Sequence, residues 1–447
     1  MSTATNVILP GYPTPSSHIH SPTYTAAPQA HEYRIAYNAR LNPNRSPLEF
    51  VKQAKNGGVS LRLSGQDDQV TVPVYGYGAS VEGTLDVHKR DGITSVEIQI
   101  EGTLMMEEMA EGGTTNCKLF LNKTILWVKD RIYEAPCPRS LPFSLPLPTT
   151  FSDGGKTYPL PPSHESHLSG LPGFRAKIKY SISAIVVKPN LIPHAVKSSL
   201  LGGGDWFYRA ISTPFEYLPR TRPSSPLPPP LVPGQWGIIE TSQWKVFPTL
   251  IHANQGGNDI MVKFYLPASR IFCMHEPIPF HIMFSSSAMS LAAFMPLGPV
   301  VTKSLKTRHT TIQLLRQTTV DVRNALILGT RTDIWRVDCI GEGAFRHAGN
   351  GGAHWTAFSG DIYISPDIKV GGFKAGGLST KDCVVLTMIP PDLSKSPFKE
   401  LRLTVPIRLA TDPYPRNGSG SAGHTSPPSI HSSDEFGATP ELGGGSW

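Results

Sequence analysis

The segment from Gln69 to Met106 constrains the fold most, because apolar and polar residues alternate along two consecutive stretches of it. The apolar rows contain Val81, Gly83, Leu85 and Val87, and then Val96, Ile98, Ile100, Gly102 and Leu104. A period of two is typical of a strand with one buried and one exposed face. Because the intervening residues 88–92 are polar and end in Asp-Gly, the pattern predicts an antiparallel hairpin that a second sheet must cover.

Similar rows recur along the rest of the chain. Strict alternation marks strands over 174–186, 260–266, 278–284 and 401–409, and two further short strands are expected within 310–323. Apolar residues alternate with Pro over 141–151, and repeated Pro can lie only at an exposed edge or in extended irregular chain. Residues 47–55 are expected to form a short helical turn. Many short strands predict an all-β chain of two tandem immunoglobulin-like β-sandwiches.

Length and composition set the expected domain boundaries. A chain of 447 residues is too long for one core, and its 41 Gly and 43 Pro indicate many loops. We expect a disordered N-terminal tail over 1–56, a first sandwich over 57–190 and a Pro-rich linker over 191–234. A second sandwich over 235–412 and a disordered C-terminal tail over 413–447 complete the prediction.

Charge and targeting signals bear on partners and location. The net charge is +7 and the sequence pI is about 9.0, but no basic run is concentrated enough to predict a nucleic-acid partner. The same charge leaves open a weak peripheral association with acidic membrane surfaces. The N-terminus lacks the pattern of a signal peptide, and no apolar run approaches roughly 18 residues. The sequence therefore predicts a cytoplasmic protein.

No pattern of catalytic or metal-binding residues emerges from the sequence. The five cysteines lack metal-ligand spacing and are interpreted as small core residues: Cys117, Cys137, Cys273, Cys339 and Cys383. His164 and His167 are close, but they are expected in a Pro-rich loop with no helix to align them. The HExxH, GxSxG and P-loop motifs are absent. We therefore expect no enzyme activity, no metal and no cofactor.

The order of the strand motifs resembles a known family. The succession VSLRLSG, YGYGASVEGTLDV, ITSVEIQIEGTL, LPFSLPLP and GFRAKIKYSISAIV is similar to the N-terminal domain of the arrestin superfamily. IPFHIMFSSS and VVLTMIPPDLSKSPFKELRLTVPIRLA resemble the C-terminal domain of fungal arrestin-like proteins, the α-arrestins. The resemblance covers residues 57–411 and implies the arrestin fold. It also implies a non-enzymatic adaptor that binds cytoplasmic segments of membrane transporters or receptors and is recruited to the plasma membrane or endosomes for endocytic trafficking.

The same resemblance implies a route to a ubiquitin ligase. Family members enter the WW domains of HECT-type ligases through PPxY or LPxY motifs. This chain has no PPxY, but Leu9, Pro10, Gly11 and Tyr12 form one LPxY. Pro favours the extended polyproline II conformation that WW grooves accept, and the Tyr ring would fill a second pocket. The alternative interpretation is an ordinary Pro-Tyr pair in a tail.

Other interpretations remain open at this point. Arg220, Pro223 and Pro226 fit an SH3-binding pattern, although a stiff hinge between domains is the favoured interpretation. The chain could instead be an arrestin-fold subunit of a retromer-like endosomal sorting complex, or a signalling scaffold, without ligase recruitment. A β-sandwich enzyme or carbohydrate-binding module is the third alternative, which the missing catalytic cluster disfavours.

Overall fold

The computed structural model describes residues 32–35, 48–55, 57–66, 70–109, 113–130, 135–188, 208–254, 257–301, 308–323, 331–350 and 353–415. Of these residues, 62% lie in strands and 3% in helices, which confirms the predicted all-β class. The chain divides into two compact units, Met1–Tyr414 and Pro415–Trp447, and every element described below belongs to the first.

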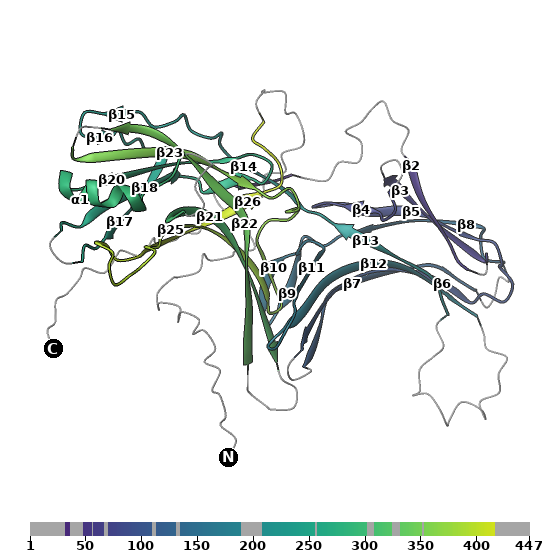
Figure 1. The fold of residues 1–447 in the computed structure, drawn as a ribbon. Helices are drawn as coiled ribbons and strands as arrows, with labels where there is room; N and C mark the ends of the chain where they lie inside the picture. The colour runs from purple at the N-terminus through teal and green to yellow at the C-terminus, as the bar shows by residue number, and fades with distance from the viewer. Residues whose placement is uncertain are drawn as a thin grey trace, which may run out of the picture. The chain divides into compact units, whose positions relative to one another are not determined.

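The first half of the chain forms a sandwich of two sheets (Figure 1). One sheet has the order β4-β13-β12-β6-β7, with β11 paired to β12: β4 (Val74–Tyr75), β6 (Ser95–Glu108), β7 (Thr114–Val128), β11 (His164–Leu168), β12 (Phe174–Val187) and β13 (Tyr208–Tyr217). The other has the order β2-β3-β5-β8: β2 (Leu48–Gln53), β3 (Val59–Gln66), β5 (Ser80–Val87) and β8 (Ser140–Pro146). Two short strands, β9 (Thr150–Asp153) and β10 (Lys156–Pro159), pair separately.

The apolar rows seen in the sequence fill the core between these sheets. Val81 and Leu85 of β5, and Val96, Ile98 and Ile100 of β6, are all fully buried. Burying such a side chain stabilises the fold by roughly 1.5–3 kcal/mol. Position 83 of this row has no room for a side chain, because a Cβ there would lie 2.0 Å from a backbone oxygen of the neighbouring strand. The alternation therefore correctly identified the strands and their buried faces.

The predicted pairing of these two strands is wrong. β5 pairs with β3 and β8, whereas β6 pairs with β7 and β12. Residues 88–94 therefore carry the chain from one sheet to the other instead of closing a hairpin. Periodicity alone could not distinguish a hairpin from a crossing between two sheets, because both strands direct their apolar rows into the same core from opposite sides. The segment does contain a turn, in which the Ile93 amide donates to the Arg90 carbonyl at 3.4 Å.

The Pro-containing strand β8 lies at the edge of its sheet. β8 is the terminal strand of its sheet, with Leu141, Phe143 and Leu145 buried. Pro142 and Pro146 face outward and are exposed. An outer strand tolerates Pro because a missing amide costs no ladder hydrogen bond there. The expectation of an exposed edge is confirmed.

Segments expected as tail and linker also contain strands. β1 (Glu32–Ile35) and β2 lie within 1–56, and β2 stands where a helical turn was predicted, so that prediction is wrong. β13 and β14 (Arg220–Pro223) lie within 191–234, where β13 pairs with β12 and β14 pairs with β1. The backbone amides and carbonyls of these segments form hydrogen bonds with a neighbouring strand, and this tertiary pairing outweighs the weak local sequence pattern.

The second half of the chain is built on one ten-stranded sheet. The order is β17-β18-β20-β23-β22-β21-β25-β26-β19, with β24 paired to β25. The bounds are β17 (Trp244–Ile251), β18 (Ile260–Pro267), β19 (Ile271–Cys273), β20 (Ile278–Ser285), β21 (Thr310–Arg323), β22 (Arg331–Asn350), β23 (Trp355–Ile364), β24 (Phe373–Ala375), β25 (Leu378–Met388) and β26 (Leu401–Ala410). Residues 310–323 form one continuous strand and not the two short strands expected.

This sheet curls so that its two ends enclose a second core. Phe264 and Phe280, near one end, share an apolar cluster with Leu314, Val384 and Leu386 toward the other. The remaining elements are the short pair β15 (Pro233–Gly234) and β16 (Gly237–Ile238), helix α1 (Ala288–Phe294) and the 3-10 turn η2 (Met295–Leu297). A sheet folded over on itself is the sandwich-like architecture that the alternating rows predicted.

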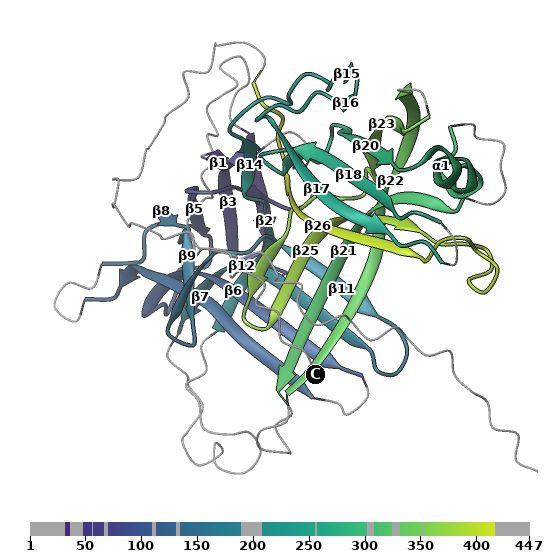
Figure 2. The ribbon, with the colours of Figure 1, turned by 90° about the vertical axis from the view of Figure 1, so that its left-hand side faces the viewer.

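The two halves share part of one core. Val320, Ile334, Phe373 and Leu378 from the second half belong to the apolar cluster of the first. The ends of β21, β22 and β25 run beside the strands of the first half (Figure 2). Arg336 of β22 also donates to the carbonyl of His167 at 2.5 Å. Each half is therefore a sandwich, and the second half contributes apolar side chains to the core of the first.

Candidate functional site

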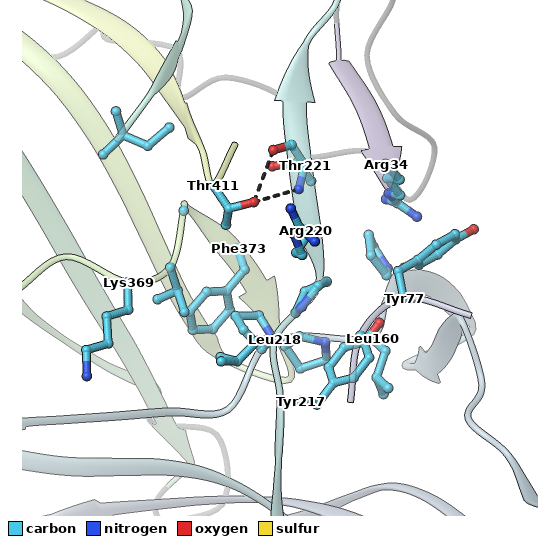
Figure 3. A pocket seen from close by; sticks show the side chains of 18 of the residues that line it. Arg34, Tyr77, Leu160, Tyr217, Leu218, Arg220, Thr221, Lys369, Phe373 and Thr411 are labelled. Carbon is cyan, nitrogen blue, oxygen red and sulfur yellow. Dashed lines mark hydrogen bonds between the residues drawn. The ribbon is translucent and has the colours of Figure 1, made fainter. Parts of the chain in front are cut away.

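A cavity of about 490 Å³ opens where the ends of several strands converge (Figure 3). Most of its wall comes from residues 74–77 around β4, residues 158–162 at the end of β10, residues 217–221 between β13 and β14, and residues 369–374 before and within β24. Residues 408–413 at the end of β26 and Arg34 of β1 complete it. Strand ends supply such walls readily, because loops leave the sheet there without burying unpaired backbone groups.

The charged groups of this cavity are strongly unbalanced. Five basic side chains line it, namely Arg34, Arg220, Lys369, Lys374 and Arg408, against the single carboxylate of Asp412. Arg220 and Asp412 form a two-pronged ion pair, in which Nε donates to Oδ2 at 3.1 Å and Nη2 donates to Oδ1. The five basic groups outnumber the one carboxylate, so the net charge of the side chains that line the cavity is positive.

The Arg220–Asp412 pair is part of a joint between β14 and the segment after β26. The Thr221 amide donates to the Thr411 hydroxyl at 2.8 Å, and that hydroxyl, which lies 3.0 Å from the Thr221 carbonyl, donates to Asp412 Oδ2 at 2.7 Å. Burial alone would raise the pKa of Asp412, but hydrogen bonds from Arg220 and Thr411 outweigh it and lower the pKa below its ordinary value. The carboxylate therefore stays charged at neutral pH.

Aromatic and apolar side chains form the rest of the wall. Tyr75, Leu160, Tyr217 and Phe373 are buried behind it. Burial raises the pKa of Tyr217 far above its ordinary value, so its hydroxyl remains protonated. The Arg34 guanidinium lies 5.3 Å from the ring centroid of Tyr77, within reach of a cation–π contact. The cavity thus offers positive charge and flat apolar surface side by side.

A buried ion pair holds one wall in place. Arg316 of β21 and Asp382 of β25 are register partners, and Arg316 donates two hydrogen bonds to Asp382, from Nε to Oδ1 at 2.8 Å and from Nη2 to Oδ2 at 3.0 Å. Their side chains are only 8% and 0% exposed. Arg316 Nη2 also donates to the carbonyl of Val370 at 2.9 Å. Because Val370 lines the cavity, this pair ties the wall to the sheet.

A histidine lies next to that wall. The ring of His164 on β11 packs edge-on against Phe373, with centroids 5.0 Å apart. Burial, with a smaller contribution from the Arg316 charge, lowers the pKa of His164 to about 4. The ring is therefore neutral at neutral pH. The sequence placed His164 and His167 in a loop, but both lie in a strand paired with β12, so that expectation is wrong.

A second candidate surface is the outer edge of β7. Among the described residues β7 pairs with β6 alone, so it is the terminal strand of its sheet. Leu121, Ile125 and Val128 project from it in one outward row, 39%, 61% and 56% exposed. An edge strand of this kind presents backbone donors and acceptors that can pair with an extended chain. Lys123 lies in the same row, 3.9 Å from Glu97 of β6.

The predicted binding motifs have different outcomes. Leu9, Pro10, Gly11 and Tyr12 lie outside the described residues. Of the SH3 candidate residues, Arg220 is held by Asp412, Pro223 is buried at the end of β14, and Pro226 is exposed beyond it. An SH3 domain would need the first two released from these contacts. The hinge interpretation stays a prediction, and in the structure Arg220 and Pro223 belong to β14, which pairs with β1.

The cysteines are scattered over both halves of the chain. No group of three or more His, Cys, Asp or Glu side chains gathers as a metal site within the ranges that the structure describes. All five cysteines are free thiols; Cys137 and Cys273 are buried as predicted, and Cys117 and Cys383 are partly buried. Cys339 is exposed on β22, so its interpretation as a core residue is wrong.

The sequence did not predict this cavity, and Arg220 was named only as part of an SH3-binding pattern. One signal was available for the buried ion pair that supports its wall. Arg316 interrupts the buried row of β21 between Leu314 and Thr318. Asp382 interrupts the row of β25 in the same way. Two opposite charges at buried-row positions of two strands predict a pair, because an unpaired charge there would be costly. Arg34 and Asp412 gave no such signal, since they come together only through long-range contacts.

Comparisons with known proteins leave the family open. No protein-family model matches the chain, and no curated protein is significantly similar to it. Among the helices that the structure describes, none has the length and apolar character needed to cross a bilayer.

Proposed function

We propose that this protein is a non-enzymatic adaptor of the fungal arrestin-like class. It would bind extended cytoplasmic segments of membrane transporters or receptors, and it would link them to a HECT-type ubiquitin ligase for endocytic trafficking. The support is the succession of strand motifs over 57–411, together with the all-β architecture of two sandwiches. Work at the membrane would be peripheral, from the cytoplasmic side.

The outer edge of β7 carries the binding half of this proposal. A row of exposed apolar side chains on a terminal strand suits an extended segment that adds to the sheet. Backbone pairing would supply affinity, and alternate side chains of the bound segment would reach Leu121, Ile125 and Val128. Lys118 and Lys123 are exposed on the same strand, which contains no acidic residue, so acidic segments are favoured.

The ligase half of the proposal depends on Tyr12. Its LPxY sequence lies 20 residues before β1 starts, so a WW domain could engage it without contacting the sandwiches. A pulldown of the full chain on an isolated WW domain array tests this role. We expect Tyr12→Ala to lose most of the binding, and Tyr24→Ala, a substitution at another tail tyrosine, to bind like the parent. Equal binding by Tyr12→Ala and the parent would defeat the role given to Tyr12.

The second candidate is a subunit of a retromer-like sorting complex, in which no ligase motif is needed. Co-purification with sorting-coat subunits that survives deletion of residues 1–31 would favour this function over the adaptor.

A further inference from the structure

A proline-rich segment, residues 226–234, runs in extended form from the end of β14 into the β15–β16 hairpin, at the outer margin of the second half (Figure 1). Its burial repeats every third residue. Leu231 is buried and Pro228 and Gly234 are partly buried, whereas all the residues between them are exposed. A polyproline II helix has three residues per turn, so every third side chain lies on one face. The segment therefore has the burial pattern of a polyproline II helix with one face on the protein and two faces toward solvent.

Specific contacts with the second half hold this segment in its extended form. The Trp244 indole Nε1 donates to the Pro229 carbonyl at 2.9 Å, and the Leu231 amide donates to His281 Nε2 at 3.1 Å. The Leu231 side chain also belongs to the apolar cluster that contains Trp244 and Trp355. Because the extended form is already fixed, a partner that binds it avoids part of the entropy cost of ordering a flexible linker.

Two exposed dipeptides of this segment have the spacing that an SH3 groove accepts. An SH3 groove binds two apolar dipeptides of a polyproline II helix in the PxxP spacing, and the residue between the dipeptides points away from the groove. Pro229-Pro230 and Val232-Pro233 are such dipeptides, and all four residues are exposed. Leu231, the residue between them, is buried against the protein, and Val232 is 61% exposed. The face that an SH3 groove would contact is therefore the face that the fold leaves open.

We propose that residues 229–233 form a docking site for an SH3 domain of a partner protein. Pro229-Pro230 would fill one pocket of the groove, and Val232-Pro233 would fill the next. Residues 218–243 contain no Tyr, so this segment lacks the Pro-Tyr motif that a WW groove would need. The docking site is separate from Tyr12 and from the edge of β7, and it does not depend on the adaptor role.

Titration of the full chain against a panel of isolated SH3 domains from the native organism tests the proposal. We expect at least one domain to bind saturably, with one site per chain. The same domain with an aromatic groove residue replaced by Ala should not bind. An absence of binding across the whole panel would overturn the proposal. Binding to an isolated WW domain instead, lost in Pro230→Ala, would assign the segment to a different class of partner and would also overturn it.

Three variants assign the binding to residues 229–233. Pro230→Ala and Val232→Glu should each weaken it by at least about tenfold, because each alters one of the two dipeptides. Pro226→Ala is the matched control: Pro226 is exposed and has PxxP spacing to Pro229, but it lies outside both dipeptides, so this variant should bind like the parent. Thermal unfolding would confirm that each variant is folded. Parent-like affinity in folded Pro230→Ala and Val232→Glu, or an equal loss in Pro226→Ala, would refute the assignment.

Discussion

At the scale of single residues, the buried pair of Arg316 and Asp382 is the most consequential contact described. Both side chains are removed from water, so each depends on the other for compensation of its charge. The pair also fixes the Val370 wall of the cavity. A substitution that removes one charge should therefore cost much more than one at an exposed pair.

We expect Asp382→Asn to lower the free energy of unfolding by about 3–5 kcal/mol, because it leaves the Arg316 charge buried without a partner. Urea unfolding of the full chain measures this. Lys177→Met, which breaks an exposed pair with Glu165 at 2.6 Å, is the control and should cost less than about 1 kcal/mol. The double variant Arg316→Met with Asp382→Leu should recover most of the loss. Equal effects of Asp382→Asn and Lys177→Met would contradict the importance of the pair.

A second residue-scale prediction concerns acid stability. His281 is 5% exposed, and its Nε2 accepts a hydrogen bond from the Leu231 amide at 3.1 Å. Burial, assisted by the Arg346 charge, lowers its pKa to about 4. The unfolded chain, with an ordinary histidine pKa near 6.5, therefore takes up a proton first as pH falls. Stability should drop between about pH 6.5 and 4, with a contribution from His281 of about 1.4 kcal/mol per pH unit.

Unfolding midpoints in urea across this pH range test the prediction. His281→Gln keeps an acceptor but cannot titrate, so its midpoint should fall less steeply than that of the parent. Exposed His88 provides the control, since His88→Gln should leave the parent slope unchanged. His164 will maintain part of the pH dependence in every variant. Identical slopes for the parent and His281→Gln would rule out the buried, neutral state of His281.

At the scale of elements, Gly102 of β6 leaves room for aromatic rings from the two neighbouring strands, β7 and β12. A Cβ at this position of β6 would lie 2.6 Å from the Tyr180 ring and 2.8 Å from the Phe120 ring. The two rings stack 6.0 Å apart, and Tyr180 is bonded through its hydroxyl to the Pro161 carbonyl at 2.5 Å. The rings on β7 and β12 therefore have little freedom to make room.

Gly102→Ala should lower the free energy of unfolding by roughly 1–3 kcal/mol through overpacking. Thr103→Ala, one residue along and on the other face of β6, should cost less. Denaturant unfolding compares the two variants. A Gly102→Ala variant as stable as the parent would mean that the aromatic layer is loosely packed.

The elements also show where sequence reasoning was sufficient. The rows in β5, β6, β12 and β26 identified strands, because burial of one face is a local property of the alternation. Pairing is not local, which is why the hairpin between β5 and β6 was predicted wrongly. β13 was missed although its Ile211, Phe215 and Tyr217 alternate, because the Pro and Gly around it indicated a linker.

At the scale of the whole molecule, the cavity could not have been predicted. Its walls come from residues as distant in sequence as Arg34 and Asp412, and nothing in a one-dimensional pattern brings these together. The all-β class followed from composition and periodicity. The sequence did not predict that the two halves share a core. The apolar row of β21 would look the same whether it packed inside one sandwich or against another.

We propose that the chain connects a membrane cargo to a ubiquitin ligase, with the edge of β7 binding the cargo and Tyr12 binding the ligase. Proximity labelling in the native cell tests it with the parent, Tyr12→Ala and Ile125→Lys, and with Val337→Lys as control, which alters an exposed β-branched residue on an interior strand. The parent and Val337→Lys should label integral membrane proteins and a HECT-type ligase. Tyr12→Ala should lose only the ligase, and Ile125→Lys should lose only the membrane proteins. Labelling of neither class by the parent, or unchanged labelling by both variants, would contradict the account.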